Sequence, residues 1–444
     1  MIEADSGKVL EAENATMPWY PASLSKLMTA YVTLQAVKDG KITLDTVFTV
    51  SSVAASQSPS KMGFRPGTHL TVDNTLKMML VKSANDMAVV LAEGVGGSID
   101  GFSVMMNQTA QKLGMTQTSY VNPNGLPADG QITSARDMAI LARAFIKNLP
   151  EYEYFVHIPS IRFGKRITQN YNKLIGRYPG ADGFKTGFIC ASGYNLVASA
   201  THDGRRLIAV VLGASSGTMR AVRAAQLLDR GFANNGLPWL KPSLGTVDQL
   251  APINASPPDL HDEVCSGKRH RPSDEDDTPI AGSAPSSTSG DGSNAMFLAS
   301  GLQTSAAKPS EWLAAAPAPS DPIVVYTGPT RTGASLTAAV AADAASQDTP
   351  KRGKKSRVAA KKKPAEPKTA DAGAKSDAKP AAKPARHANA KPDTKPDAKP
   401  AAAPTEASAK PAKPKAAAKP KGDNKGKGEG KPAKTSGEPK PAGE

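Results

Sequence analysis

A serine and a lysine three residues apart begin an apolar helical stretch, YPASLSKLMTAYVTLQAV. Residues i and i+3 lie on one face of a helix, so Lys26 is expected within reach of the Ser23 hydroxyl. Free N–H groups and the positive dipole end at a helix start favour a developing alkoxide. Apolar neighbours desolvate the lysine, and desolvation lowers the pKa of an amine. The pair therefore predicts a serine nucleophile with a lysine base.

The spacing alone is not specific, because it recurs at Ser58–Lys61, Ser305–Lys308 and Ser376–Lys379. Of the four serines, only Ser23 opens an apolar helix. Two further motifs follow in order: residues 83–85 (Ser-Ala-Asn) between two helical runs, and residues 185–187 (Lys-Thr-Gly) on a predicted strand. Ser-x-x-Lys, Ser-x-Asn and Lys-Thr-Gly, in that order, are typical of penicillin-binding proteins and class A β-lactamases.

Residues 1–239 resemble the serine-type D-alanyl-D-alanine carboxypeptidases, low-molecular-mass penicillin-binding proteins of peptidase family S11. The resemblance rests on YPASLSKLMT, VKSANDMA, DGFKTGF and GYNLVASAT, and it covers roughly the first half of the chain. It implies a β-lactamase/transpeptidase-like fold, in which helices and a helical insertion flank an antiparallel sheet. It also implies removal of the terminal D-Ala from peptidoglycan stem pentapeptides, covalent inhibition by penicillin and other β-lactams, and export to the periplasm.

The resemblance assigns the bond chemistry to three residues and gives a fourth, Asn85, to substrate binding. Ser23 attacks the carbonyl of the penultimate D-Ala, and Lys26 accepts its proton, so that an acyl-enzyme forms as D-Ala leaves. Ser83 relays a proton to the leaving amine. Asn85 holds the amide side of the substrate.

Substrate binding is assigned to a strand predicted over residues 182–189 and to the last predicted helix, residues 219–233. Lys185 and Thr186 face the terminal carboxylate, and Gly187 lets the substrate backbone lie close to the strand. The N–H groups of the nucleophile and of Phe188 form the oxyanion hole. Arg220 stands where the family has a carboxylate-binding arginine; the alternative is a solvated arginine on a helix face.

Alternatives remain open at this point. A D,D-endopeptidase or a β-lactamase could use the same scaffold. No Glu-x-x-Leu-Asn stretch occurs in the helical insertion, and Glu151 and Glu153 do not match it, so a long-lived acyl-enzyme with penicillin is expected. A third possibility is a polyanion-binding wall protein whose enzyme domain is idle; it depends on the tail alone.

The predicted elements form one discontinuous α/β domain. The opening MIEADSGKVLEAENA is typical of a hairpin, and Met1 falls where its first strand is expected to be under way, which favours an internal start. The chain as written shows no signal peptide. Helices are predicted over 23–37, 73–82, 86–93, 99–113, 134–148 and 219–233. Strands are predicted over 182–189, 194–201 and 206–214.

Composition divides the chain into three parts: a catalytic domain over 1–240, a Ser/Pro/Gly-rich linker over 241–349, and a disordered Lys/Ala/Pro-rich tail over 350–444. The linker holds two strand-like pieces, AMFLASGL and DPIVVYTGP. Residues 351–444 contain 26 Lys and Arg against 10 Asp and Glu, a net +16, whereas the whole chain is +15, so the remainder sums to −1. The basic charge therefore belongs to the tail.

Partners follow from the same division. The tail is expected either to be a solvated spacer or to contact anionic wall polymer or a membrane surface; nucleic acid is not expected. Isolated histidines give no metal-ligand spacing, so neither a metal nor another cofactor is expected. Cys190 and Cys265 are the only cysteines, and the sequence leaves their pairing open.

Overall fold

The computed structural model describes residues 1–233, 243–266, 313 and 316–348. By its internal contacts the chain divides into Met1–Arg357 and Val358–Glu444, and the second unit lies outside the described residues. The predicted disorder of the tail and the strand-like piece AMFLASGL also lie outside them. The division of the chain at residues 240 and 349 therefore stays a prediction.

A five-stranded antiparallel sheet organises the fold, with the order β1-β9-β8-β6 and with β7 also paired to β8. Its strands are β1 (Ile2–Glu3), β6 (Ala181–Gly183), β7 (Thr186–Ile189), β8 (Gly193–His202) and β9 (Arg205–Ala214). A D-G turn joins β8 to β9: Asp203 and Gly204 have φ of 50° and 75°, as a tight hairpin turn requires. Two long apolar strands thus lie at the centre of the sheet.

The strand predicted over residues 182–189 is wrong in one respect, because it is broken in the middle. Phe184 adopts φ of 78°, and the pairing of β6 with β8 is irregular between Ala181 and Gly183. An irregularity of this kind bends a strand and re-aims the side chains next to it. The break lies beside Lys185, the first residue of the Lys-Thr-Gly motif.

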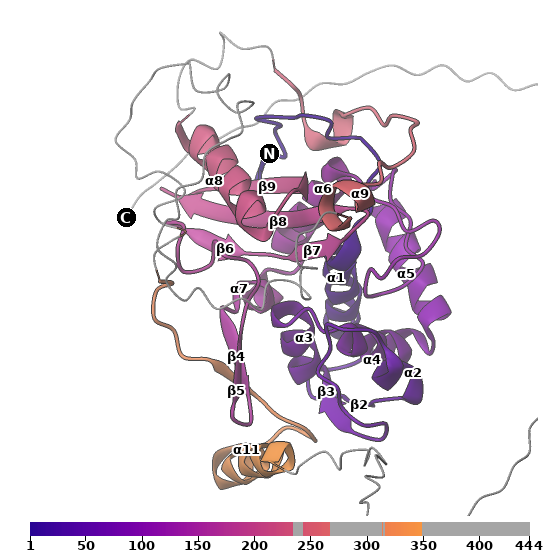
Figure 1. Cartoon of the computed structure of the whole chain (residues 1–444), viewed down its shortest axis with the longest axis vertical. Coiled ribbons are helices and arrows are strands. Elements are labelled where there is room, and N and C mark those ends of the chain that lie inside the picture. The colour runs from indigo at the N-terminus through magenta and orange to yellow at the C-terminus, as the bar shows by residue number, and fades with distance from the viewer. Residues whose placement is uncertain (234–242, 267–312, 314–315, 349–444) are drawn as a thin grey trace, which may run out of the picture. The chain divides into compact units, whose positions relative to one another are not determined.

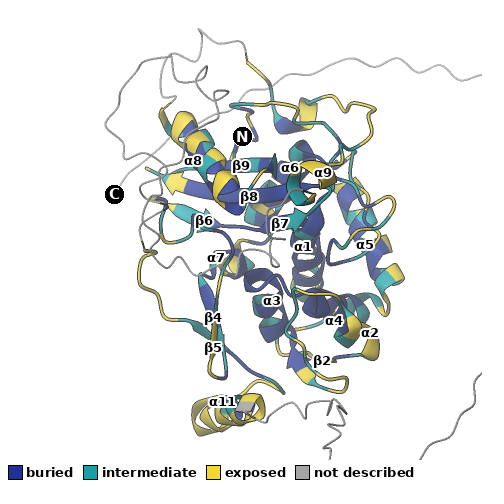
Figure 2. Ribbon diagram, in the orientation of Figure 1, coloured by how far each residue is buried: buried dark blue, intermediate teal, exposed yellow. Residues whose placement is uncertain are grey.

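Helices cover both faces of the sheet. Figure 1 shows α8 (Gly217–Ala233) lying across the strands, while α6 (Ala135–Asn148) belongs to the other layer. Two neighbouring residues of β8 face the two layers. Val197 packs with buried side chains of α1 and α6, whereas Leu196 packs with buried side chains of α8. Successive strand residues point to opposite faces, so both faces of this sheet are buried (Figure 2).

The helical insertion follows the nucleophile helix. A 3₁₀ turn, η1 (Ala22–Leu24), precedes α1 (Ser25–Lys38), and α2 (Ser52–Ser56), α3 (Val72–Val81), α4 (Asn85–Gly96) and α5 (Ile99–Lys112) come before α6. Ser134 caps the N-terminus of α6, since its Oγ accepts from the Asp137 N–H at 3.1 Å. Among the described helices no single one is long and apolar enough to span a bilayer. The helices α4 and α5 reach that length and apolar character only when taken together, and the chain bends by 83° between them.

Several short elements were not predicted. They are β2 (Val47–Thr49) paired with β3 (His69–Thr71), β4 (Ser160–Phe163) paired with β5 (Arg166–Gln169), η2 (Pro150–Tyr152) and α7 (Tyr154–His157). Most of their strand residues are exposed or half-buried, so their sequences lack the clear alternation that marks a strand.

The chain beyond α8 returns to this domain. It forms η4 (Val247–Gln249), α9 (His261–Cys265), β10 (Ile323–Val325) and α11 (Gly333–Asp348). β10, the strand-like piece predicted in DPIVVYTGP, pairs in parallel with β4. A disulfide joins Cys190 to Cys265 across 75 residues. Part of the predicted linker therefore packs on the domain, and α11 within it is a helix that we did not predict.

Candidate active site

The predicted nucleophile and base meet at the start of α1. Lys26 Nζ lies 2.8 Å from Ser23 Oγ, 2.7 Å from Asn85 Oδ1 and 2.8 Å from the Asn124 carbonyl oxygen. Lys26 is fully buried, whereas Ser23 is half-buried. The predicted helix starts one residue early as a 3₁₀ turn, with φ of 48° at Ala22, so Ser23 lies in this turn and α1 begins at Ser25. The accessible hydroxyl thus adjoins a buried amine.

The partners of Lys26 suit a proton acceptor. A neutral amine has two N–H donors and one lone pair. Asn85 Oδ1 and the Asn124 carbonyl are both acceptors, so together they can take the two N–H groups. The lone pair then faces the Ser23 hydroxyl, which can donate its hydrogen to it. This is the arrangement that a base acting on Ser23 requires.

The second and third motifs also come together. Lys185 Nζ donates to Ser83 Oγ at 3.0 Å and to the Thr186 carbonyl at 2.9 Å. Ser83, at the turn between α3 and α4, has φ of 58°, an uncommon value for a residue with a side chain. Such backbone strain costs of order 1–3 kcal/mol and tends to gather at functional sites. The structure places a serine hydroxyl beside a lysine cation.

The free edge of β7 faces η1. Residues 185 and 197 exchange two backbone hydrogen bonds, so the N–H and C=O of residue 185 point toward β8. These directions alternate along an antiparallel strand, so residues 187 and 189 also bond toward β8. The Phe188 N–H therefore points away from β8. A Cβ built on Gly187 would lie 3.1 Å from the backbone nitrogen of Ser23. The space beside Gly187 is therefore filled by η1, so the missing side chain lets β7 pack against this turn. The role of Gly187 in the approach of a substrate backbone stays a prediction.

Thr186 carries an unpaired polar group. Its Oγ1 atom is buried and has no hydrogen-bond partner among the described residues. A buried hydroxyl without a partner costs about 1–3 kcal/mol, so such groups need an explanation. A ligand carboxylate between Thr186 and Lys185 would supply the missing partner.

Arg220 is buried rather than solvated. Its side chain is 2 % exposed, and its guanidinium donates to the carbonyls of Gly187 at 3.5 Å and Tyr171 at 3.3 Å. It also lies over the Tyr194 ring, 5.6 Å from the ring centre. The alternative of a solvated helix-face arginine is wrong. The positive charge stands behind β7, next to the Lys-Thr-Gly motif.

Three residues that support this site were not predicted. Asn124 supplies a carbonyl to Lys26 and packs beside Gly125, where a Cβ would collide with the Ala22 carbonyl. Asn195 donates to the Tyr20 carbonyl at 3.0 Å and so ties β8 to the chain before η1. Asp86 fixes a loop beside Asn85, as described below. Asparagines in NPNG and GYN give only a turn or strand signal, so their roles depend on tertiary contacts.

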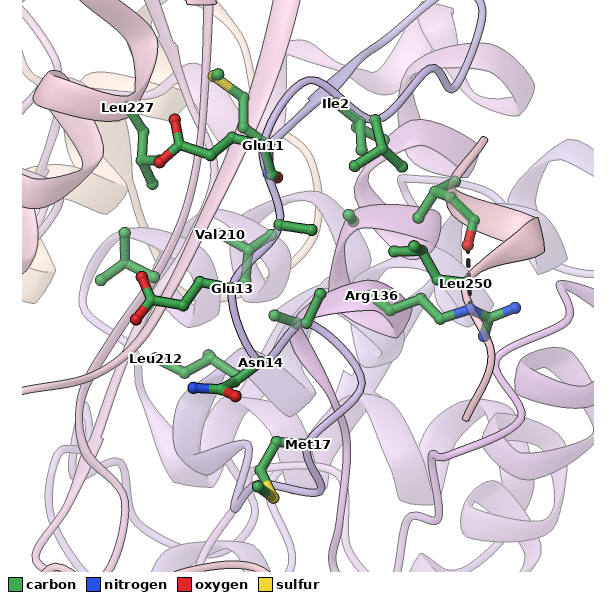
Figure 3. Close-up of a pocket in the computed structure, with 18 of the residues that line it drawn as sticks. Ile2, Glu11, Glu13, Asn14, Met17, Arg136, Val210, Leu212, Leu227 and Leu250 are labelled. Atoms are coloured by element: carbon green, nitrogen blue, oxygen red, sulfur yellow. Dashed lines mark hydrogen bonds between the residues drawn. The ribbon is translucent and has the colours of Figure 1, made fainter. Parts of the chain in front are cut away.

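Two cavities differ in their relation to these residues. One of about 200 Å³ lies beside η1 and is lined by Ala22, Gly125 and Ile189. A larger one of about 780 Å³ is lined by Val210, Leu212 and other residues of the N-terminal segment, α6, β9 and α8 (Figure 3). Neither cavity is lined by a residue of the three motifs, although the smaller one adjoins the turn that carries Ser23. We assign the candidate site by its chemistry, because volume alone supplies neither a nucleophile nor a base.

The comparisons agree with this geometry. Residues 1–216 match the family model of D-alanyl-D-alanine carboxypeptidases. The chain is 41% identical over 240 residues to D-alanyl-D-alanine carboxypeptidase DacC of Escherichia coli, covering 52% of this chain and 60% of the relative. It is 34% identical over 245 residues to DacB2 of Mycobacterium tuberculosis, covering 53% of this chain and 81% of the relative.

Solved structures give the same result. Penicillin-binding protein 5 from Haemophilus influenzae superimposes with a TM-score of 0.51 at 38% identity, covering 52% of this chain and 69% of that one. The chain spans about three fifths of the length of several of its curated relatives. Sequence and fold agree, and the chain belongs to the D-alanyl-D-alanine carboxypeptidase family.

Proposed function

We propose that this protein is a serine-type D-Ala-D-Ala carboxypeptidase that works through an acyl-enzyme on Ser23. The observation that carries the proposal is the environment of Lys26: its amine lies 2.8 Å from Ser23 Oγ, with two acceptors oriented to hold its N–H groups. The substrate is a peptidoglycan stem peptide that ends in D-Ala-D-Ala. β-Lactams acylate the same serine.

The bond chemistry balances with these residues alone. Lys26 takes the Ser23 proton as Oγ forms a bond to the carbonyl carbon of the penultimate D-Ala. The C–N bond then breaks, and the leaving amine receives a proton relayed through Ser83. Water hydrolyses the ester, and its proton returns to restore Ser23. In this scheme the Lys185 cation beside Ser83 favours transfer of the hydroxyl proton.

Binding of the substrate uses the β7 edge. Lys185, Thr186 and Arg220 bind the terminal carboxylate; the unpartnered Thr186 hydroxyl supports this assignment. The N–H groups of Ser23 and Phe188 form the oxyanion hole, which the outward direction of the Phe188 N–H supports. Each such donor contributes roughly 3–4 kcal/mol to the transition state. Asn85 holds the substrate amide.

Slow release of penicillin is part of the proposal. Neither glutamate considered above serves as a base near Ser23: Glu151 pairs with Lys38 at 3.2 Å, and Glu153 pairs with His157 at 3.2 Å. A D,D-endopeptidase or a β-lactamase on the same scaffold is the alternative. Product analysis on a pentapeptide, a cross-linked peptide and penicillin separates the three.

Export is a further part of the proposal. The Cys190–Cys265 disulfide supports an oxidising compartment such as the periplasm, because disulfides persist there and are rare in the cytosol. The net charge of +16 over residues 351–444 supports contact of the tail with anionic wall polymer or a membrane surface. Removing residues 350–444 should leave activity on a small peptide intact; loss of that activity would contradict an independent catalytic domain.

Intact-protein mass spectrometry after penicillin treatment tests the function directly. One covalent adduct per chain, located on the peptide that contains Ser23, is expected, together with release of D-Ala from a pentapeptide. An adduct on another residue, or no adduct and no D-Ala release, would overturn the proposal.

A further inference from the structure

A loop of irregular structure, residues 57–63, lies against the Ser-Ala-Asn motif; we call it the 57–63 loop. Asn85 Nδ2 donates to the Ser58 carbonyl at 3.0 Å and to the Pro59 carbonyl at 3.2 Å. The Asn85 N–H donates to the Ser60 carbonyl at 2.7 Å, and Ser60 Oγ donates to the Lys82 carbonyl at 2.9 Å. The loop is thus tied to the motif by both backbone and side-chain groups.

The far end of this loop is held by a buried carboxylate. Asp86, fully buried in the first turn of α4, accepts from the Gly63 N–H at 2.8 Å and from the Met62 N–H at 3.0 Å. It also accepts from the Met87 N–H at 3.0 Å. Burial raises the pKa of Asp86, and these N–H bonds oppose that effect. A buried charge is tolerated only when it is hydrogen-bonded, so the carboxylate holds the loop strongly.

The loop in turn decides which way the Asn85 amide faces. A side-chain amide presents an acceptor oxygen on one side and a donor nitrogen on the other. Two loop carbonyls require the nitrogen, so the oxygen must face Lys26, at 2.7 Å. Without those carbonyls the amide could rotate by about 180° and present N–H groups to Lys26. The amine would then lose one of the acceptors that orient its lone pair toward Ser23.

We propose that Asp86 is a positioning residue for the Ser23–Lys26 pair. It pins the 57–63 loop, the loop fixes the Asn85 amide, and the amide oxygen holds one N–H of Lys26. This inference rests on the proposed function. It predicts that Asp86 affects the acylation step rather than the binding of the substrate carboxylate, which lies with the β7 residues.

The test compares two Asp→Asn variants of the full chain. Asp86→Asn keeps the size of the side chain but removes its charge and turns one end into a donor that faces a backbone N–H. We expect the second-order acylation rate with penicillin, and kcat on a D-Ala-D-Ala peptide, to fall about ten- to a hundredfold, with KM changed little. Asp73→Asn, at the first turn of α3 and paired with Lys77, is the matched control and should change neither.

A double-mutant cycle with Asn85→Ala asks whether the effect passes through Asn85. Asn85→Ala alone should slow acylation, and adding Asp86→Asn should slow it no further. Hydrogen exchange at the Met62 and Gly63 amides should speed up in Asp86→Asn, which reports release of the loop. Multiplicative effects, or an acylation rate for Asp86→Asn equal to wild type, would overturn the inference.

Further measurements separate a failure of this inference from a failure of the proposed function, and they cover a variant that does not fold. If Asp86→Asn does not fold, Ser60→Ala removes another tether of the loop, and an unchanged acylation rate there overturns the route through the loop. If wild-type protein is not acylated by penicillin at all, the proposed function fails. If wild type is acylated and Asp86→Asn matches it, only the role of Asp86 fails.

Discussion

The two edges of the central sheet differ in how their polar groups are used. At the β7 edge, η1 fills the space beside the strand, and the amines of Lys26 and Lys185 each lie within hydrogen-bond distance of a serine hydroxyl and of a backbone carbonyl oxygen. At the opposite edge, the strand β9 is covered by the short strand β1, and among the described residues only Leu207 and Ile208 of β9 have strand partners there. The large cavity lies along the rest of that edge (Figure 3).

This difference shows that volume and chemistry need not coincide. The β9 cavity is spacious, and most of the residues that line it are apolar. Two of its charged residues, Arg230 and Glu11, pair with each other. The β7 edge offers little empty space but places the proposed nucleophile Ser23, the proposed base Lys26 and two further polar side chains at hydrogen-bond distances. Fixed polar groups accelerate a reaction because they need no reorganisation when charge develops.

The largest expected effect is at the nucleophile. Ser23→Ala should abolish covalent labelling by penicillin and D-Ala release while leaving the melting temperature near wild type, since Ser23 is half-buried and its main contact is with Lys26. Ser376→Ala, in another Ser-x-x-Lys sequence, is the control and should label normally. Persistent labelling of the Ser23 variant would place the reactive group elsewhere.

Arg220 tests whether the β7 edge binds a carboxylate. Arg220→Ala should lower kcat/KM on a free-acid peptide by roughly ten- to a hundredfold, because a charge-assisted bond to a carboxylate contributes about 1.5–3 kcal/mol. A C-terminally amidated peptide should be much less affected. Arg223→Ala, on the same helix and exposed, is the control. Equal losses on both substrates would mean that Arg220 supports β7 through Gly187 instead.

The smallest expected effect separates stability from activity at the β7 edge. Thr186→Val removes a buried hydroxyl that has no partner among the described residues, so stability should stay equal or rise by about 1 kcal/mol. kcat/KM on a free-acid peptide should fall about five- to tenfold, because the carboxylate loses a donor.

Thr33→Val is the matched control, because Thr33 Oγ1 is also buried without a partner in the described part of the chain. Its stability should change in the same direction and its activity should not change. Unchanged activity in Thr186→Val as well would remove Thr186 from the carboxylate site.

The fold was predictable where periodicity is strong. The helices α3, α5, α6 and α8 begin and end within two residues of the predicted bounds, and β8 and β9 match the two apolar runs on either side of the D-G turn. The continuous strand over 182–189 was wrong, because a left-handed residue at Phe184 leaves no composition signal. The helix α11 was not predicted; its sequence is rich in alanine, which favours a helix, but it lies in a Ser/Pro/Gly-rich part of the chain.

The sequence by itself determined that Lys26 faces Ser23, because a spacing of three residues keeps two side chains together across the helical turn that runs from η1 into α1. Only the tertiary structure decided what surrounds the pair. The Asn124 carbonyl, the Asn85 amide and the Asp86 carboxylate come from segments 59 to 98 residues downstream. Backbone carbonyls and amide orientations carry no sequence signature. Packing places them, since a buried polar group must find its partner wherever the fold supplies one.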